Sequence, residues 1–116
     1  NEGDEGDEEA SKDFTVTNSG AMSYVFNSDD VTNLENPDLT LKRGETYTFA
    51  VSASGHPFFI KSVQGNTNAD AYNEGVTNNG TQDGTITFVV PMDAPDTLFY
   101  NCQFHSMMTG TLNIVD

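Results

Sequence analysis

Apolar residues recur at every second position in six short stretches of the sequence, and this feature restricts the fold more than any other. A period of two, in runs rich in β-branched and aromatic residues, is typical of strands with one buried face. No stretch shows the apolar stripe of a helix, so the sequence predicts an all-β fold. The apolar faces comprise Phe14 and Val16; Leu39 and Leu41; Tyr47, Phe49, Val51 and Ala53; Ile86, Phe88 and Val90; Leu98, Tyr100 and Cys102; and Leu112 and Ile114.

Turn-forming residues separate these stretches. Residues 42–44, Lys-Arg-Gly, predict one turn, and Gly, Pro, Asn and Asp lie between the other stretches. Short strands joined in this way are typical of an antiparallel sandwich or barrel. Residues 65–84 are too polar for a core strand and too long for a simple hairpin loop. We interpret them as a surface excursion with one short turn of helix or strand near residues 69–72.

The chain has 116 residues, of which 18 are acidic and 4 are basic, giving a formal net charge of −14 at pH 7. Four basic residues are too few to form a positively charged surface along the phosphates of a nucleic acid, so nucleic acid is excluded as a partner. The acidic start, NEGDEGDEEASK, lacks apolar periodicity, so we expect a disordered tail at 1–13 and one domain at 14–116. No apolar run approaches the roughly 18 residues of a membrane helix, so the chain is not expected to span a membrane.

The single cysteine, Cys102, lies in the segment NCQFHSMMTG beside a histidine and two methionines. A lone cysteine in a chain of extracellular character is a reactive thiol, one half of an intermolecular bridge or a metal ligand. The alternation gives His56 the same side as Phe58 and Ile60, and gives Cys102 the same side as Tyr100. Both side chains are therefore expected to point inward from strand ends, at one end of the sandwich.

The spacing Cys-x2-His-x2-Met lets one short loop bring a thiolate, an imidazole and a thioether to one point. Cys102, His105 and Met108 carry these groups, and His56 adds a second imidazole from a distant strand. Two histidines, one cysteine and a weak axial methionine form the type 1 copper arrangement, and zinc suits the same groups less distinctively. A rigid sandwich that holds both segments resists rearrangement when copper changes oxidation state, as fast electron transfer requires.

Four segments resemble those of the cupredoxins, the small blue copper proteins that include plastocyanin, amicyanin, pseudoazurin and azurin. LTLKRGETYTFAV resembles the strand-turn-strand before the first ligand, and GHPFFI resembles the segment of the first histidine. GTITFVVPMDAPDTLFYNC resembles the strand pair that leads to the cysteine, and CQFHSMMTGTLNIV resembles the ligand loop and last strand. The resemblance covers residues 14–115 and implies an antiparallel Greek-key β-sandwich.

The resemblance also implies one copper ion that cycles between Cu(II) and Cu(I), with His56, Cys102, His105 and Met108 as its ligands. Met108 matches the family spacing better than its neighbour Met107 does. The implied function is one-electron transfer between redox partner proteins by a monomer, with no substrate turned over. Because cupredoxins typically work outside the cytoplasm, we expect an exported, periplasmic or extracytoplasmic protein, with any membrane anchor placed before residue 1.

The resemblance makes His105 the more exposed ligand, surrounded by a docking patch of Phe104, Ser106 and Met107. The acidic surface would steer redox partners whose docking faces are basic. In plastocyanin-like sites an asparagine or serine beside the first histidine ties the ligand loops together. Ser54 is the residue of this chain expected to fill that role.

The same residues fit other functions less well. A copper nitrite reductase or multicopper oxidase needs further histidines or a second cysteine, and none is left once His56 and His105 are used. The chain alone is therefore not expected to be an enzyme, although it fits a domain of a larger copper oxidoreductase. The adjacent methionines keep copper storage or delivery as an alternative. A copper-free structural domain is disfavoured because all four ligands are present.

Overall fold

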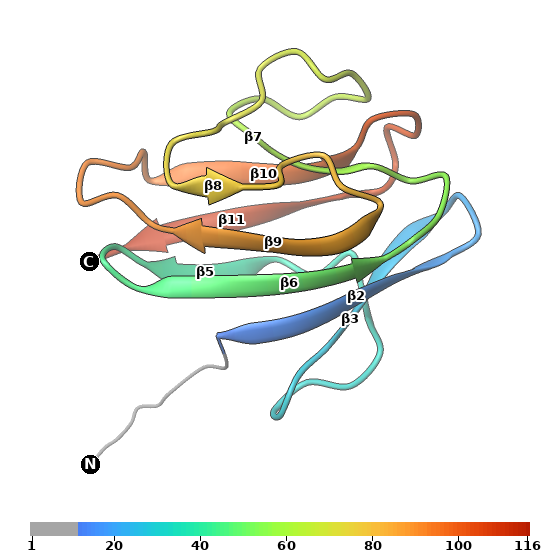
Figure 1. The fold of residues 1–116 in the computed structure, drawn as a ribbon, viewed down its shortest axis with the longest axis horizontal. Helices are drawn as coiled ribbons and strands as arrows, with labels where there is room; N and C mark the ends of the chain where they lie inside the picture. The colour runs from blue at the N-terminus through green and yellow to red at the C-terminus, as the bar shows by residue number, and fades with distance from the viewer. Residues whose placement is uncertain (1–11) are drawn as a thin grey trace.

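The computed structural model describes residues 12–116, and the expected tail lies outside this range except for Lys12 and Asp13. Two β-sheets pack face to face, and no helix occurs in residues 12–116 (Figure 1). No helix in this part of the chain therefore has the length and apolarity to cross a membrane. The predicted all-β sandwich is confirmed.

The smaller sheet has four strands in the order β5-β11-β10-β7. Its antiparallel pairs are β10 with β11 and β10 with β7, whereas β11 and β5 run parallel. The strand bounds are Leu39–Lys42 for β5, Phe58–Lys61 for β7, Thr97–Cys102 for β10 and Thr109–Val115 for β11.

The larger sheet has six strands in the order β4-β3-β2-β6-β9-β8. The pair of β2 with β6 is parallel, and the other pairs are antiparallel. The strand bounds are Asp13–Ser19 for β2, Ser23–Asn27 for β3, Leu34–Glu35 for β4, Thr46–Ser52 for β6, Val76–Thr77 for β8 and Asp83–Val89 for β9.

The core lies between the sheets, and every residue assigned to an apolar face from the sequence is buried in it. Aromatic rings fill the centre. Phe58 stacks on Tyr100 with ring centroids 5.3 Å apart, and Phe26 contacts both Tyr100 and Phe49. Rings of this size exclude water and fix the spacing of the two sheets, so the strand ends are held rigidly.

Three features were not predicted. Strand β3 contributes Tyr24 and Phe26, both fully buried, to the core. Two strand pairs are parallel, which side-chain alternation alone cannot indicate. The excursion at residues 65–84 contains the short strand β8, which was not predicted, and one isolated bridge from Ala71 to Lys61, which agrees with the turn expected near residues 69–72.

Candidate metal centre

Three potential metal ligands meet at one end of the sandwich. The connections from β6 to β7 and from β10 to β11, which carry them, lie at the right of Figure 1. Cys102 is the last residue of β10, and His105 lies in the loop that leads to β11. His56 lies in the turn between β6 and β7. The pairing of β7 with β10 sets Phe58, two residues after His56, opposite Cys102. Strand pairing therefore brings two distant segments together. We call this part of the molecule the cysteine end.

The donor atoms of these three residues all lie within 4.8 Å of one another. The Nδ1 atoms of His56 and His105 are 3.8 Å and 3.4 Å from the Cys102 Sγ. The two imidazole rings are tilted, with centroids 4.9 Å apart. Cys102 is fully buried and both histidines are half-buried. Two ring nitrogens thus converge on one thiol at the boundary between core and solvent.

Met108 closes the loop that carries two of these residues, which we call the Cys–Met loop (residues 102–108). The Met108 N–H donates to the His105 carbonyl oxygen (3.2 Å), and the Cys102 N–H donates to the Met108 carbonyl oxygen (2.9 Å). Met108 is fully buried, whereas Met107 is 54% exposed. Only one of the two thioethers therefore lies inside the protein with the thiol.

Backbone groups join the Cys–Met loop to the turn of His56. The Gln103 N–H donates to the Pro57 carbonyl oxygen (3.1 Å). The Phe104 N–H donates to the Cys102 Sγ (3.5 Å) and so orients the sulfur. Ser54, the residue expected to tie the loops, is exposed. The observed tie needs no particular side chain, which is why the sequence could not indicate it.

The comparisons with known proteins concern the fold. No protein-family model and no curated protein sequence matches the chain. Rusticyanin from Thiobacillus ferrooxidans is 21% identical, with a TM-score of 0.55 over 90% of this chain and 79% of that chain. A purple cupredoxin from Nitrosopumilus maritimus is 17% identical, with a TM-score of 0.51 over 90% of this chain and 99% of that chain. The chain has the cupredoxin fold. A mutant of rusticyanin gives the same result, with 20% identity and a TM-score of 0.56 over 90% and 79% of the two chains.

Within this cupredoxin fold, Tyr24 is a residue of the site that the sequence did not reveal. Its hydroxyl donates to the His56 carbonyl oxygen (2.7 Å). Burial raises the pKa of this phenol far above its usual value, and the neighbouring Cys102 raises it further. The hydroxyl therefore keeps its proton and acts as a donor that fixes the His56 backbone. The shared parity of Tyr24 and Phe26 in SYVFN was the signal available.

The electrostatics of this end of the cupredoxin fold favour a neutral imidazole at His56. Burial lowers the pKa of His56, and the neighbouring His105 lowers it further. A neutral imidazole keeps the lone pair that a metal requires. The two segments that carry the potential ligands, residues 53–57 and 103–108, and the nearby residues 20–22 contain no Asp, Glu, Lys or Arg.

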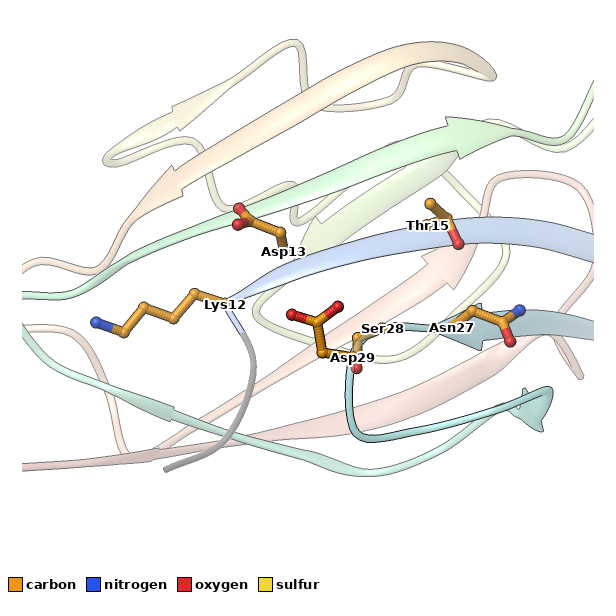
Figure 2. Close-up of a pocket in the computed structure, with 6 residues that line it drawn as sticks. All are labelled: Lys12, Asp13, Thr15, Asn27, Ser28 and Asp29. Atoms are coloured by element: carbon orange, nitrogen blue, oxygen red, sulfur yellow. The ribbon is translucent and has the colours of Figure 1, made fainter. Parts of the chain in front are cut away.

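A surface hollow of about 430 Å³ lies away from these ligands, near the start of β2 (Figure 2). Short polar residues line it, and Lys12 extends away from the carboxylates of Asp13 and Asp29. Its lining contains no histidine, cysteine or methionine. Among residues 12–116, the potential metal ligands that come together lie at the cysteine end. There, two imidazole nitrogens meet a thiol, and a buried methionine closes the same loop. Imidazole, thiol and thioether are the donor types that type 1 copper sites use.

Proposed function

We propose that the protein is a mononuclear type 1 copper protein that carries single electrons between redox partners. His56, Cys102, His105 and Met108 would hold the ion. The observation that carries this proposal is the convergence of two Nδ1 atoms on the buried Cys102 Sγ. The cupredoxin fold of the chain supports it independently.

Copper, when bound, supplies the reversible one-electron step. The residues of the chain keep the donors in place through that step. Tyr24 fixes the His56 backbone, and the Gln103 N–H joins the two loops. The burial of Cys102 and Met108 keeps water from both sulfur atoms. Donors held in this way do not need to rearrange when the charge of the ion changes.

Copper delivery is the second candidate, and two exposed thioethers favour it. Met22 is 65% exposed and Met107 is 54% exposed. The Asn36 Nδ2 donates to both of their carbonyl oxygens, at 3.3 Å and 3.1 Å, so their backbones lie side by side. Thioethers select Cu(I). The buried thiol favours the carrier, because a metal enclosed with it exchanges slowly.

The partner is proposed to be a redox protein that docks at the cysteine end, where Phe104 and Met107 are exposed. Because residues 20–22, 53–57 and 103–108 contain no Asp, Glu, Lys or Arg, the acidic remainder of the surface would provide any steering of a basic partner. We place the protein outside the cytoplasm, since oxidising compartments are where a copper thiolate carrier would operate.

Titration of the purified protein with Cu(II), followed by visible absorption and EPR, tests the proposal. We expect an intense thiolate-to-copper band and a narrow copper hyperfine splitting that are complete at one equivalent. A colourless or multi-equivalent response would refute a type 1 site. Transfer of bound Cu(I) to a chelator within minutes would instead favour delivery.

A further inference from the structure

The alternation of buried and exposed side chains fails at two positions of the smaller sheet. Tyr100 and Cys102 face the core, so Asn101 between them faces the outer side, as Lys61 does beside Ile60. Outer positions of a sandwich are normally exposed, yet Asn101 is 0% exposed and Lys61 is 1% exposed. Some other part of the chain must therefore cover the outer side of β7 and β10 at this point.

The cover is the irregular segment at residues 62–67, which follows β7 and is yellow-green in Figure 1. We call it the cover segment. The Asn101 Oδ1 accepts a hydrogen bond from the Gly65 N–H (3.1 Å), and the Lys61 Nζ donates to the carbonyl oxygens of Gly65 and Thr67 (2.7 Å each). Gly65 has φ +148°, a conformation that favours glycine. Buried polar side chains thus hold both backbone groups of one glycine.

The same amide group of Asn101 also reaches the Cys–Met loop. Its Nδ2 donates to the carbonyl oxygens of Cys102 (3.0 Å) and His105 (3.4 Å). A second contact lies at the far end of that loop, where the Gln64 Nε2 donates to the Thr109 Oγ1 (3.1 Å). The cover segment is therefore bonded to the residues that flank the loop, Asn101 before Cys102 and Thr109 after Met108.

We propose that Asn101 is a positioning residue for the metal centre. Its side-chain amide joins the cover segment to the Cys–Met loop and so fixes the Cys102 thiol relative to the His105 imidazole. The inference rests on the proposed function for the identity of the metal only, because the hydrogen bonds belong to the protein itself. A purely structural asparagine would change stability and leave the geometry of the donor atoms unchanged.

A matched pair of variants separates these two roles. Asn101→Leu removes the amide and keeps the branching of the side chain at Cγ, although leucine is larger. Asn79→Leu makes the same change in the later part of the excursion. There, the Asn79 Oδ1 accepts from the Ile60 N–H (2.7 Å), and its Nδ2 donates to the carbonyl oxygens of Ile60 and Tyr72 (3.0 Å each). Those bonds involve no residue of the Cys–Met loop, so Asn79→Leu is the structural control.

The first measurement is amide hydrogen exchange in the copper-free full-length protein. In Asn101→Leu we expect faster exchange of the Cys102 and Met108 amides, which close the loop, and in Asn79→Leu we expect wild-type exchange at both. The second measurement uses the copper-loaded protein. There, the Asn101→Leu variant should show a changed copper hyperfine splitting and should lose copper to a chelator about tenfold faster than the wild type does. Asn79→Leu should leave both unchanged.

Wild-type exchange of both amides in Asn101→Leu, or an equal increase in Asn79→Leu, would overturn the inference. A failure to form a type 1 site in the wild-type protein would refute the proposed function alone, since the exchange experiment needs no metal. Should Asn101→Leu not fold, Gln64→Ala decides instead, because Gln64 is exposed and its loss tolerable. Faster Met108 amide exchange in that variant supports the positioning role, and an unchanged rate contradicts it.

Discussion

The two ends of the sandwich are stabilised by different kinds of interaction. At the cysteine end, neutral hydrogen bonds from Tyr24 and Gln103 hold the segments together. At the opposite end, which we call the arginine end, Arg43 donates to the Ala94 carbonyl oxygen and to the carboxylates of Asp96 (2.7 Å) and Asp116 (2.9 Å). Charged pairs therefore gather where no candidate ligand lies.

The proposed function would give this difference a physical reason. A fixed charge beside a redox metal shifts the balance between its two oxidation states, whereas neutral hydrogen bonds fix geometry with little effect on that balance. The carboxylates that pair with Arg43 are exposed, with side chains of Asp96 and Asp116 more than 90% accessible. Such pairs weaken with salt, so the arginine end should respond to ionic strength and the cysteine end should not.

The largest effect is expected from Cys102→Ser, which removes the only thiol. The intense visible band should vanish completely, because a hydroxyl gives no low-energy charge transfer to copper. The arginine end should be unaffected, so the variant should remain folded by circular dichroism. An unchanged visible spectrum would remove Cys102 from the site.

Met108→Leu should raise the reduction potential measured by protein voltammetry. Loss of an axial donor in a buried apolar position disfavours Cu(II) more than Cu(I). Met107→Leu is the control, because the Met107 side chain is exposed and should leave the potential near the wild-type value. The reverse pattern would assign the axial position to Met107.

Tyr24→Phe and Tyr100→Phe compare two buried hydroxyls. Each donates to a backbone carbonyl oxygen, that of His56 at 2.7 Å and that of Pro37 at 2.6 Å. Both variants should lose about 1 kcal/mol of unfolding free energy in denaturant titrations. Only Tyr24→Phe should also alter the copper EPR spectrum. Equal spectra for the two variants would show that the Tyr24 hydroxyl does not act on the site.

Arg43→Met should lower the melting temperature by a few degrees without changing the copper spectrum. The loss should shrink at high salt, because the removed ion pairs are exposed. Calorimetry at two ionic strengths measures both effects. A changed copper spectrum would mean that the two ends are coupled.

The smallest effect is the pH dependence of the copper-free protein. The pKa of His56 is lowered from 6.5, so the unfolded chain binds its proton at a higher pH than the folded protein does. The contribution to stability is therefore complete above pH 6.5 and is lost as the pH falls through the folded-state pKa. Denaturant midpoints across this range measure it, and His56→Gln should give a flatter profile.

The sequence predicted the faces of most strands because one-sided burial imposes a period of two. It also indicated that His56 and Cys102 point inward from the same end, and the structure brings their donor atoms together. The assignment of His56, Cys102, His105 and Met108 as copper ligands stays a prediction, which the titration above tests.

Other features depend on chain segments that meet only in the folded protein. Asn101 is buried because residues 62–67 fold over the outer side of β10, and no local pattern indicates that fold-back. Strand β3 differs from these features, because its sequence SYVFN already shows the alternation of Tyr24 and Phe26. The parallel pairs β2–β6 and β5–β11 depend on the path of the connections between sheets.

Both described ends of the chain leave the molecule at the arginine end. Strand β2 begins beside Lys12, which pairs with Glu45 at 2.6 Å, and β11 runs away from Met108 toward Asp116, which pairs with Arg43. A linker to an electrode or a fused reporter domain that continued from either described end, at Lys12 or at Asp116, would start away from His105. These two ends suit oriented immobilisation with no substitution at the cysteine end.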